Sequence, residues 1–208
     1  MVYYLLIIGM EGTQDTMKQY FKMMSGSVCL AILMICIGSG FTNGVDEGVY
    51  QFLKHNITQD WTIQYFTIIS TVLSPISCLI YVIILLIVLY IRDRFKFWWY
   101  GFWCCSVFVI GTILKYVIQR PRPNVMIDGF SFPSMHVLSV CVFVSLILLM
   151  KNHKVLKCIA IFLVISIMIS RIYLQAHYFT DTIGSLIVLY VMLQALNIGK
   201  MNDQNREI

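Results

Sequence analysis

Six long apolar stretches, separated by short polar segments, constrain the fold of this chain more than any other feature. A helix needs about 20 mostly apolar residues to cross roughly 30 Å of hydrocarbon, and each stretch approaches that length. The chain is 59% hydrophobic and only 12% charged, which is more apolar than soluble domains. We therefore predict an all-α integral membrane six-helix bundle. The expected spans are residues 24–41, 72–91, 97–118, 135–150, 155–173 and 179–198.

The rest of the chain divides around these spans. Residues 24–198 form the expected six-span domain, preceded by a cytoplasmic or interfacial tail, 1–23, and followed by a cytoplasmic tail, 199–208. Residues 42–59 mix charged and apolar side chains, which predicts a short interfacial helix between the first two spans. Tryptophans prefer the membrane interface, and we expect that role for those near span ends. They are Trp61, Trp98, Trp99 and Trp103.

The lysines and arginines are divided unequally between the two sides of the expected bundle. With the N-terminus inside, ten lie on the cytoplasmic side and five on the outer side. Basic residues favour the cytoplasmic side, so we predict a multi-pass protein of the cell membrane with both termini in the cytoplasm. The basic residues form short clusters and no continuous stripe, so we expect no nucleic-acid partner. The seven cysteines form no CxxC pair, and we interpret them as small buried hydrophobic residues.

Three segments at the outer ends of spans hold most of the polar residues that a bilayer would otherwise exclude. A charged side chain at membrane depth costs a few kcal/mol and persists only when it is paired or bound. Lys115, Arg122 and Arg171 supply three cations, whereas Asp181 is the only carboxylate in these segments. Such a surplus predicts an anion site, and phosphate suits guanidinium and ammonium groups together. The segments are 115–123 (KYVIQRPRP), 130–136 (FSFPSMH) and 170–181 (SRIYLQAHYFTD).

The spacing within these segments predicts which side chains converge. Lys115 and Arg122 are seven residues apart, two helical turns, so both can point to one side. His177 and Asp181 are four apart, so the carboxylate can accept a hydrogen bond from one ring nitrogen and leave the other to attack phosphorus. Ser134 is an expected helix N-cap, where backbone N–H groups favour an anion.

These segments resemble the signature of the type 2 phosphatidic acid phosphatase superfamily, KxxxxxxRP, PSGH and SRxxxxxHxxxD. Lys115, Arg122 and Pro123 match the first motif. The third motif is matched by Ser170, Arg171, His177 and Asp181. The intervals between motifs and the six-span layout are similar to those of small bacterial members over about residues 24–198.

This resemblance implies a role for each residue of the motifs. His177 would be the nucleophile, Asp181 the residue that orients it, and His136 the general acid. The phosphate would be bound by Lys115, Arg122, Ser134, Met135 and Arg171. No metal or other cofactor is implied, and the partners would be a lipid phosphate substrate and the membrane lipids. The distribution of basic residues described above predicts that this site faces outward.

Met135 stands where the family usually has glycine. If that glycine is needed for a positive φ, methionine costs on the order of 1 kcal/mol and tilts His136. If the position only donates its backbone N–H, methionine does so equally well, and its side chain narrows the pocket. We favour the second interpretation.

The predicted function is hydrolysis of a membrane lipid phosphate or diphosphate through a phosphohistidine. Undecaprenyl diphosphate, phosphatidylglycerol phosphate and phosphatidic acid are candidate substrates. The alternative is a phospholipid-binding protein with weak or no turnover, and a transporter is disfavoured because the helix breaks cluster at one face. Arg120 misses the motif spacing, and we interpret it as a surface residue. Asp46 and Glu47 are adjacent, so they do not face each other on a helix and predict no functional pair.

Overall fold

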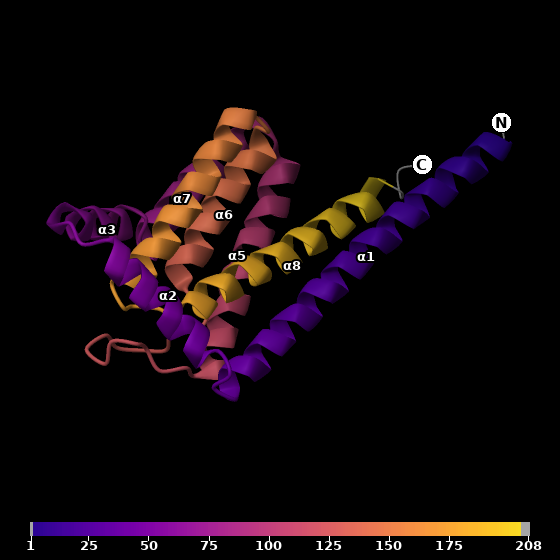
Figure 1. Ribbon diagram of the computed structural model, residues 1–208. Helices are drawn as coiled ribbons and strands as arrows, with labels where there is room; N and C mark the ends of the chain where they lie inside the picture. Colours follow the sequence, from indigo (N-terminus) through magenta and orange to yellow (C-terminus); the bar gives the residue numbers. More distant parts are fainter. Residues whose placement is uncertain (1, 205–208) are drawn as a thin grey trace.

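The computed structural model describes residues 2–204, and within that range it contains eight helices and no strand (Figure 1). Side chains are described for residues 15–59 and 61–200. The helices are α1 (Val2–Gly38), α2 (Asn43–Asn56), α3 (Asp60–Val72), α4 (Pro75–Arg92), α5 (Arg94–Ile118), α6 (Met135–Met150), α7 (Lys154–Tyr173) and α8 (Phe179–Gln204).

Five stretches of helix within the described residues are long and apolar enough to cross a membrane: Asp15–Gly38, Pro75–Arg92, Arg94–Ile118, Lys154–Tyr173 and Phe179–Lys200. Each coincides with one of the expected spans. The remaining expected span coincides with α6, which has 16 residues and a length of about 24 Å. The protein is therefore an all-helical, multi-pass membrane protein.

Helix α1 runs without a break through the segment that the sequence predicted to be a separate tail. It packs along α8 over most of its length (Figure 1). The expected C-terminal tail, 199–208, is likewise helical as far as Gln204. Met1 and residues 205–208 lie outside the described range.

Two helices connect the first span to α4. Helix α2 coincides with the predicted interfacial helix, whereas α3 was not predicted as a separate element. A break at Leu73 and Ser74 separates α3 from α4, with the Ser74 side chain accepting the Ser77 N–H and Pro75 in the first turn of α4. The expected span 72–91 begins close to this break, but the sequence predicted no helix over residues 60–71, which are less apolar than α4. At 13 residues, about 20 Å, α3 is too short to span, and it packs against α7.

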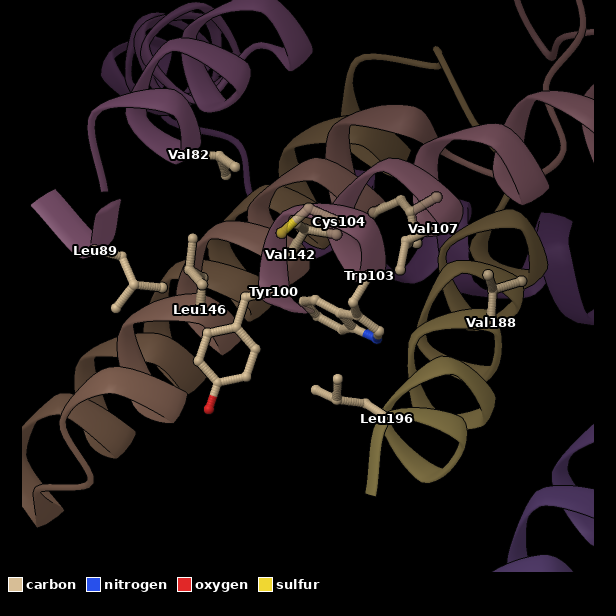
Figure 2. Close-up of a cluster of buried hydrophobic side chains, with 11 residues drawn as sticks. Val82, Leu89, Tyr100, Trp103, Cys104, Val107, Val142, Leu146, Val188 and Leu196 are labelled. Carbon is tan, nitrogen blue, oxygen red and sulfur yellow. The ribbon is translucent and has the colours of Figure 1, made fainter. Parts of the chain in front are cut away.

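Helix α6 is the centre of the bundle, with nine buried residues and contacts to α4, α5, α7 and α8. Figure 2 shows the core cluster formed where α4, α5, α6 and α8 meet. Trp103 lies in this cluster, only 4% exposed, and its indole N–H donates to the Met192 carbonyl at 2.8 Å. The membrane anchor predicted at Trp103 is therefore wrong, because a backbone carbonyl inside the bundle satisfies its N–H.

The ends of four helices gather at one end of the bundle. There α5 and α7 end, α6 and α8 begin, and the loop 119–134 closes the surface, while the start of α1 lies at the opposite end (Figure 1). Phe132, fully buried, fixes this loop against α8: a Cβ on Gly184 would lie 2.3 Å from its ring, so only glycine allows the approach. Ser185 also donates its hydroxyl to the Ser134 carbonyl at 3.0 Å. The loop is thus held firmly where the three polar segments meet.

Candidate active site

The three polar segments predicted to form a site converge at this end of the bundle. The ring of His136, half-buried at the start of α6, lies within electrostatic range of the charges that come from the other two segments. Ser134 donates its backbone N–H to the Asp181 carbonyl at 3.3 Å. The groups near His136 are Arg171, His177, Arg122 and Lys115.

Lys115 and Arg122 reach the site from α5 and from the loop that follows it. Gln119 ends α5 in a left-handed conformation, φ +49°, so the chain changes direction sharply after the last helical turn, which contains Lys115. The Lys115 ammonium donates to the Phe130 carbonyl at 2.6 Å, and the Arg122 guanidinium donates to the Ala176 carbonyl at 3.0 Å. Carbonyls fix these cations in place but leave their charge uncompensated.

Arg171 enters the site from the last turn of α7. Its Nη1 donates to the hydroxyl of Ser70 on α3, a contact that the sequence prediction missed because α3 itself was missed. Within residues 15–200, apart from Asp60, no salt bridge involves Lys115, Arg122 or Arg171. The predicted surplus of positive charge is therefore present in the structure.

The ring of His177 is held in one orientation, with 2% of the residue exposed. Nδ1 lies 2.7 Å from the Ser131 carbonyl, and because a carbonyl only accepts, Nδ1 carries the proton. Nε2 then carries the lone pair and accepts a hydrogen bond from Nη1 of Arg122 at 3.3 Å. The sequence predicted Asp181 as the hydrogen-bond partner of this ring, but its Oδ2 lies 3.7 Å from Nδ1, farther away than the Ser131 carbonyl.

Several donors around the site have no protein partner. Among the described side chains, five buried polar atoms lack a hydrogen bond, and three of them are Ser131 Oγ, Ser134 Oγ and Arg171 Nε. Ser134 is the N-cap of α6, but its hydroxyl makes no capping bond. The first bond of α6 runs from the Leu138 N–H to the Ser134 carbonyl, so the N–H groups before it lack an intrahelical acceptor. Buried polar groups are usually satisfied, and these donors suit a bound anion.

The Met135 side chain turns away from these donors. Met135 opens α6 without a positive φ; the only non-glycine residues of the described chain that have one are Gln119 and Gln175. Its sulfur packs near Gly111 of α5 and lines an apolar groove of about 460 Å³ between α4 and α5. The positive-φ interpretation is thus excluded, and the Met135 side chain borders the groove.

The interpretation of Arg120 is wrong, and that of Asp46 and Glu47 is incomplete. Arg120 is no surface residue: it is 7% exposed and forms salt bridges with Asp46 at 2.7 Å and with Asp181 at 2.8 Å. Asp46 is 3% exposed and lies at this end of the bundle, while its neighbour Glu47 is exposed. Adjacent residues on a helix do not face each other, as expected, but the sequence did not predict that Asp46 alone of the pair is buried.

Burial lowers the pKa of His177 to about 4, the nearby Asp181 carboxylate partly opposes this, and the Arg171 and Arg122 charges add to the lowering. The imidazole is therefore neutral at physiological pH, as a nitrogen nucleophile requires.

Comparison with known proteins shows the family and supports the fold. The sequence matches the PAP2 superfamily over residues 96–202, just over half of the chain. A transmembrane PAP2 type phosphatidylglycerolphosphate phosphatase from Bacillus subtilis has a similar structure, with a TM-score of 0.72 at 22% identity over 90% of this chain and 98% of that one. LpxE from Aquifex aeolicus is similar with a TM-score of 0.58 at 21% identity, over 72% and 93% of the two chains. No curated protein sequence matched.

The protonation state of His177 gives a direct test of this site. The chain has four histidines, so ¹⁵N-histidine labelling yields four ring systems, and a His177→Asn variant identifies one of them. Because the pKa is lowered to about 4, we expect this ring to stay neutral, with the proton on Nδ1, until the pH falls toward 4. A His177 ring that titrates between pH 6 and 7 would contradict the described burial.

Proposed function

Because the chain belongs to the PAP2 superfamily, we propose that it is a hydrolase that removes phosphate from a lipid phosphate or diphosphate through a phosphohistidine on His177. The observation that carries the proposal is the surplus of cations around a neutral imidazole. Lys115, Arg122 and Arg171 lie near the site without a carboxylate partner among the described side chains. A phosphate group would supply the missing negative charge.

In the first step Nε2 of His177 attacks the terminal phosphorus, and the bond from phosphorus to the leaving oxygen breaks; this is the lipid oxygen in a monophosphate and the bridging oxygen in a diphosphate. The Nδ1–H bond to the Ser131 carbonyl at 2.7 Å supports this, because it leaves the lone pair on Nε2 and stabilises the positive ring that forms. His136 protonates the leaving oxygen, and the incoming phosphate dianion favours the protonated form of His136 that this requires. The Ser134 hydroxyl and the three cations bind the phosphate oxygens.

In the second step water attacks phosphorus and the bond to Nε2 breaks. His136, now neutral, takes the proton from water, so both histidines return to their starting state and phosphate leaves. The proposed chemistry needs no metal, because Lys115, Arg122 and Arg171 supply the positive charge.

The groove between α4 and α5 supports a lipid as the substrate. It is lined almost entirely by apolar side chains, and it extends from Met135, next to Ser134 and His136, to Gly101. From Thr112 to Gly101 along α5 the groove is about 16 Å long, enough for most of an extended acyl chain or for the first few isoprene units of a prenyl chain. We propose that the lipid tail lies in this groove while its phosphate reaches His177.

We further propose that six spans, with α6 as the sixth, place the site at the outer face of the cell membrane. Two basic clusters, Arg92–Lys96 and Lys151–Lys157, lie at the opposite ends of the helices that carry the site, which supports a cytoplasmic position for them and for both termini. An outward site suits a polyprenyl diphosphate such as undecaprenyl diphosphate. Phosphatidylglycerol phosphate, for which the Bacillus subtilis relative is named, and phosphatidic acid are the other candidates.

Phosphate release from these three lipids by purified protein tests the reaction. We expect turnover in the presence of a chelator and a fall of about 10³-fold or more in His177→Ala, because the nucleophile is lost. Activity that survives in His177→Ala would exclude the phosphohistidine. An inactive parent that gains activity in Met135→Gly would instead favour the phospholipid-binding alternative.

A bulky residue in the groove should separate lipid substrates from soluble ones. A Cβ on Gly101 has only Leu86 within 4.0 Å, so Gly101→Trp is expected to fold and to fill the groove. We expect it to raise KM for a long-chain lipid phosphate severalfold while leaving hydrolysis of a water-soluble phosphate ester unchanged. Ile113→Trp, on the same helix but outside the groove, is the control. Equal effects on both substrates would place the tail elsewhere.

Cysteine labelling in intact cells tests the orientation. Met126, 86% exposed in the loop beside the site, and Asn152, exposed between α6 and α7, report on opposite ends of the bundle. A membrane-impermeant maleimide should label Met126→Cys in intact cells and Asn152→Cys only after lysis, beyond the background of the parent. The reverse pattern would place the site in the cytoplasm.

A further inference from the structure

A buried ionic network lies beside the site and outside the motifs that identify it. Its centre is Arg120, whose Nη2 donates to Asp46 of α2 at 2.7 Å and whose Nη1 donates to Asp181 of α8 at 2.8 Å. The ring of Tyr178 covers one face of the guanidinium, with 3.9 Å between the guanidinium carbon and the ring centroid. Both terminal nitrogens are thus engaged within the protein, so Arg120 does not belong to the cations that await a phosphate.

Asp46 fixes the start of α8 from a different helix. Its Oδ1 accepts the backbone N–H of Thr180 at 2.8 Å, and its Oδ2 accepts the Thr180 hydroxyl at 2.8 Å as well as Arg120. Thr180 lies in the first turn of α8, where N–H groups have no intrahelical acceptor. Asp46 therefore caps α8 and holds Arg120 at the same time.

Arg120 in turn fixes both the position and the rotation of the Asp181 carboxylate. Oδ1 accepts from Arg120, whereas Oδ2 accepts the Tyr178 N–H at 2.9 Å and faces Nδ1 of His177 at 3.7 Å. Rotation of the carboxylate away from the imidazole would break one of these two bonds. Because Arg120 holds Oδ1, Oδ2 is the oxygen that faces His177.

We propose that Arg120 and Asp46 are positioning residues of the active site: Asp46 holds Arg120, and Arg120 holds Asp181 in the orientation that serves His177. The inference rests on the proposed phosphohistidine mechanism and extends it to α2, a helix that lies outside the three motifs. Neither residue touches the substrate. Their effect is on the rate of the chemical step and not on phosphate binding.

The test compares conservative variants with matched controls. Asp46→Asn keeps the shape of the side chain but removes the charge, and Arg120→Lys keeps the charge but lacks the fork that bridges two carboxylates. We expect each to lower kcat about 10- to 100-fold, as misplaced catalytic groups do, with KM and the inhibition constant of inorganic phosphate within about twofold of the parent. The controls, Glu47→Gln on the exposed face of α2 and Arg94→Lys at the far end of α5, should leave kcat unchanged.

A double variant tests whether Asp46 and Arg120 act through one series of contacts that ends at Asp181. If Asp46 acts through Arg120, the loss in the double variant should be close to that of Arg120→Lys alone, because coupled residues are not additive. Losses that multiply would show independent effects and overturn the proposal. So would a normal kcat in Asp46→Asn, or a loss of phosphate affinity and melting temperature together with kcat, which would indicate a purely structural role.

Failure of this inference can be told apart from failure of the proposed function. A parent that hydrolyses no lipid phosphate contradicts the function, yet the His177 ring still reports on its surroundings by ¹⁵N spectroscopy. In that case Asp46→Asn and Arg120→Lys should shift the His177 ring signals, and Glu47→Gln should not. Unchanged His177 signals in both network variants would overturn the positioning role, whatever the activity of the parent.

Discussion

Charge at the edge of a hydrocarbon layer has to be met by protein groups, because little water is available there to solvate it. This protein meets the requirement in two different ways at one end of its bundle. Arg120 is paired with two carboxylates and covered by an aromatic ring, so its charge is neutralised within the protein. Lys115 and Arg122 are held by backbone carbonyls, which fix their position but leave their charge available. Arg120 therefore stabilises the structure around the site, whereas the charges of Lys115 and Arg122 remain available to an anion.

The fold supplies the polar groups that such a site needs from the ends of its helices. Inside the bundle, backbone N–H and C=O groups are satisfied along each helix, and only the termini leave donors and acceptors free. The start of α6 offers Ser134 and N–H groups, while the start of α8 brings Asp181 close to His177. Because four helix ends gather at one face, these groups are concentrated where the loop 119–134 closes the surface.

The sequence predicted which short segments meet at the site, because Lys115, Arg122, His177 and Asp181 follow one another in motif order. Helical periodicity did not place them, since α5 ends at Ile118, before Arg122, and α8 begins at Phe179, after His177. The partners that escaped prediction come from distant segments: Asp46 is 74 residues from Arg120, and Ser70 is 101 from Arg171. The acceptor for the His177 N–H is a backbone carbonyl, which cannot be predicted from the type of residue that carries it. Helix α3 was missed because it is shorter and less apolar than a membrane span.

The docking of α2 on α8 has a consequence for the order in which the chain is completed during synthesis. Asp46 is made 134 residues before Thr180, whose N–H and hydroxyl it accepts, and well before Arg120. Arg120 is the first of these partners to be made, and the contacts with Thr180 form only after the last helix leaves the ribosome, so the buried position of Asp46 is completed only then. The chain between the first and second spans is therefore among the earliest parts to be translated and among the last to reach its native place.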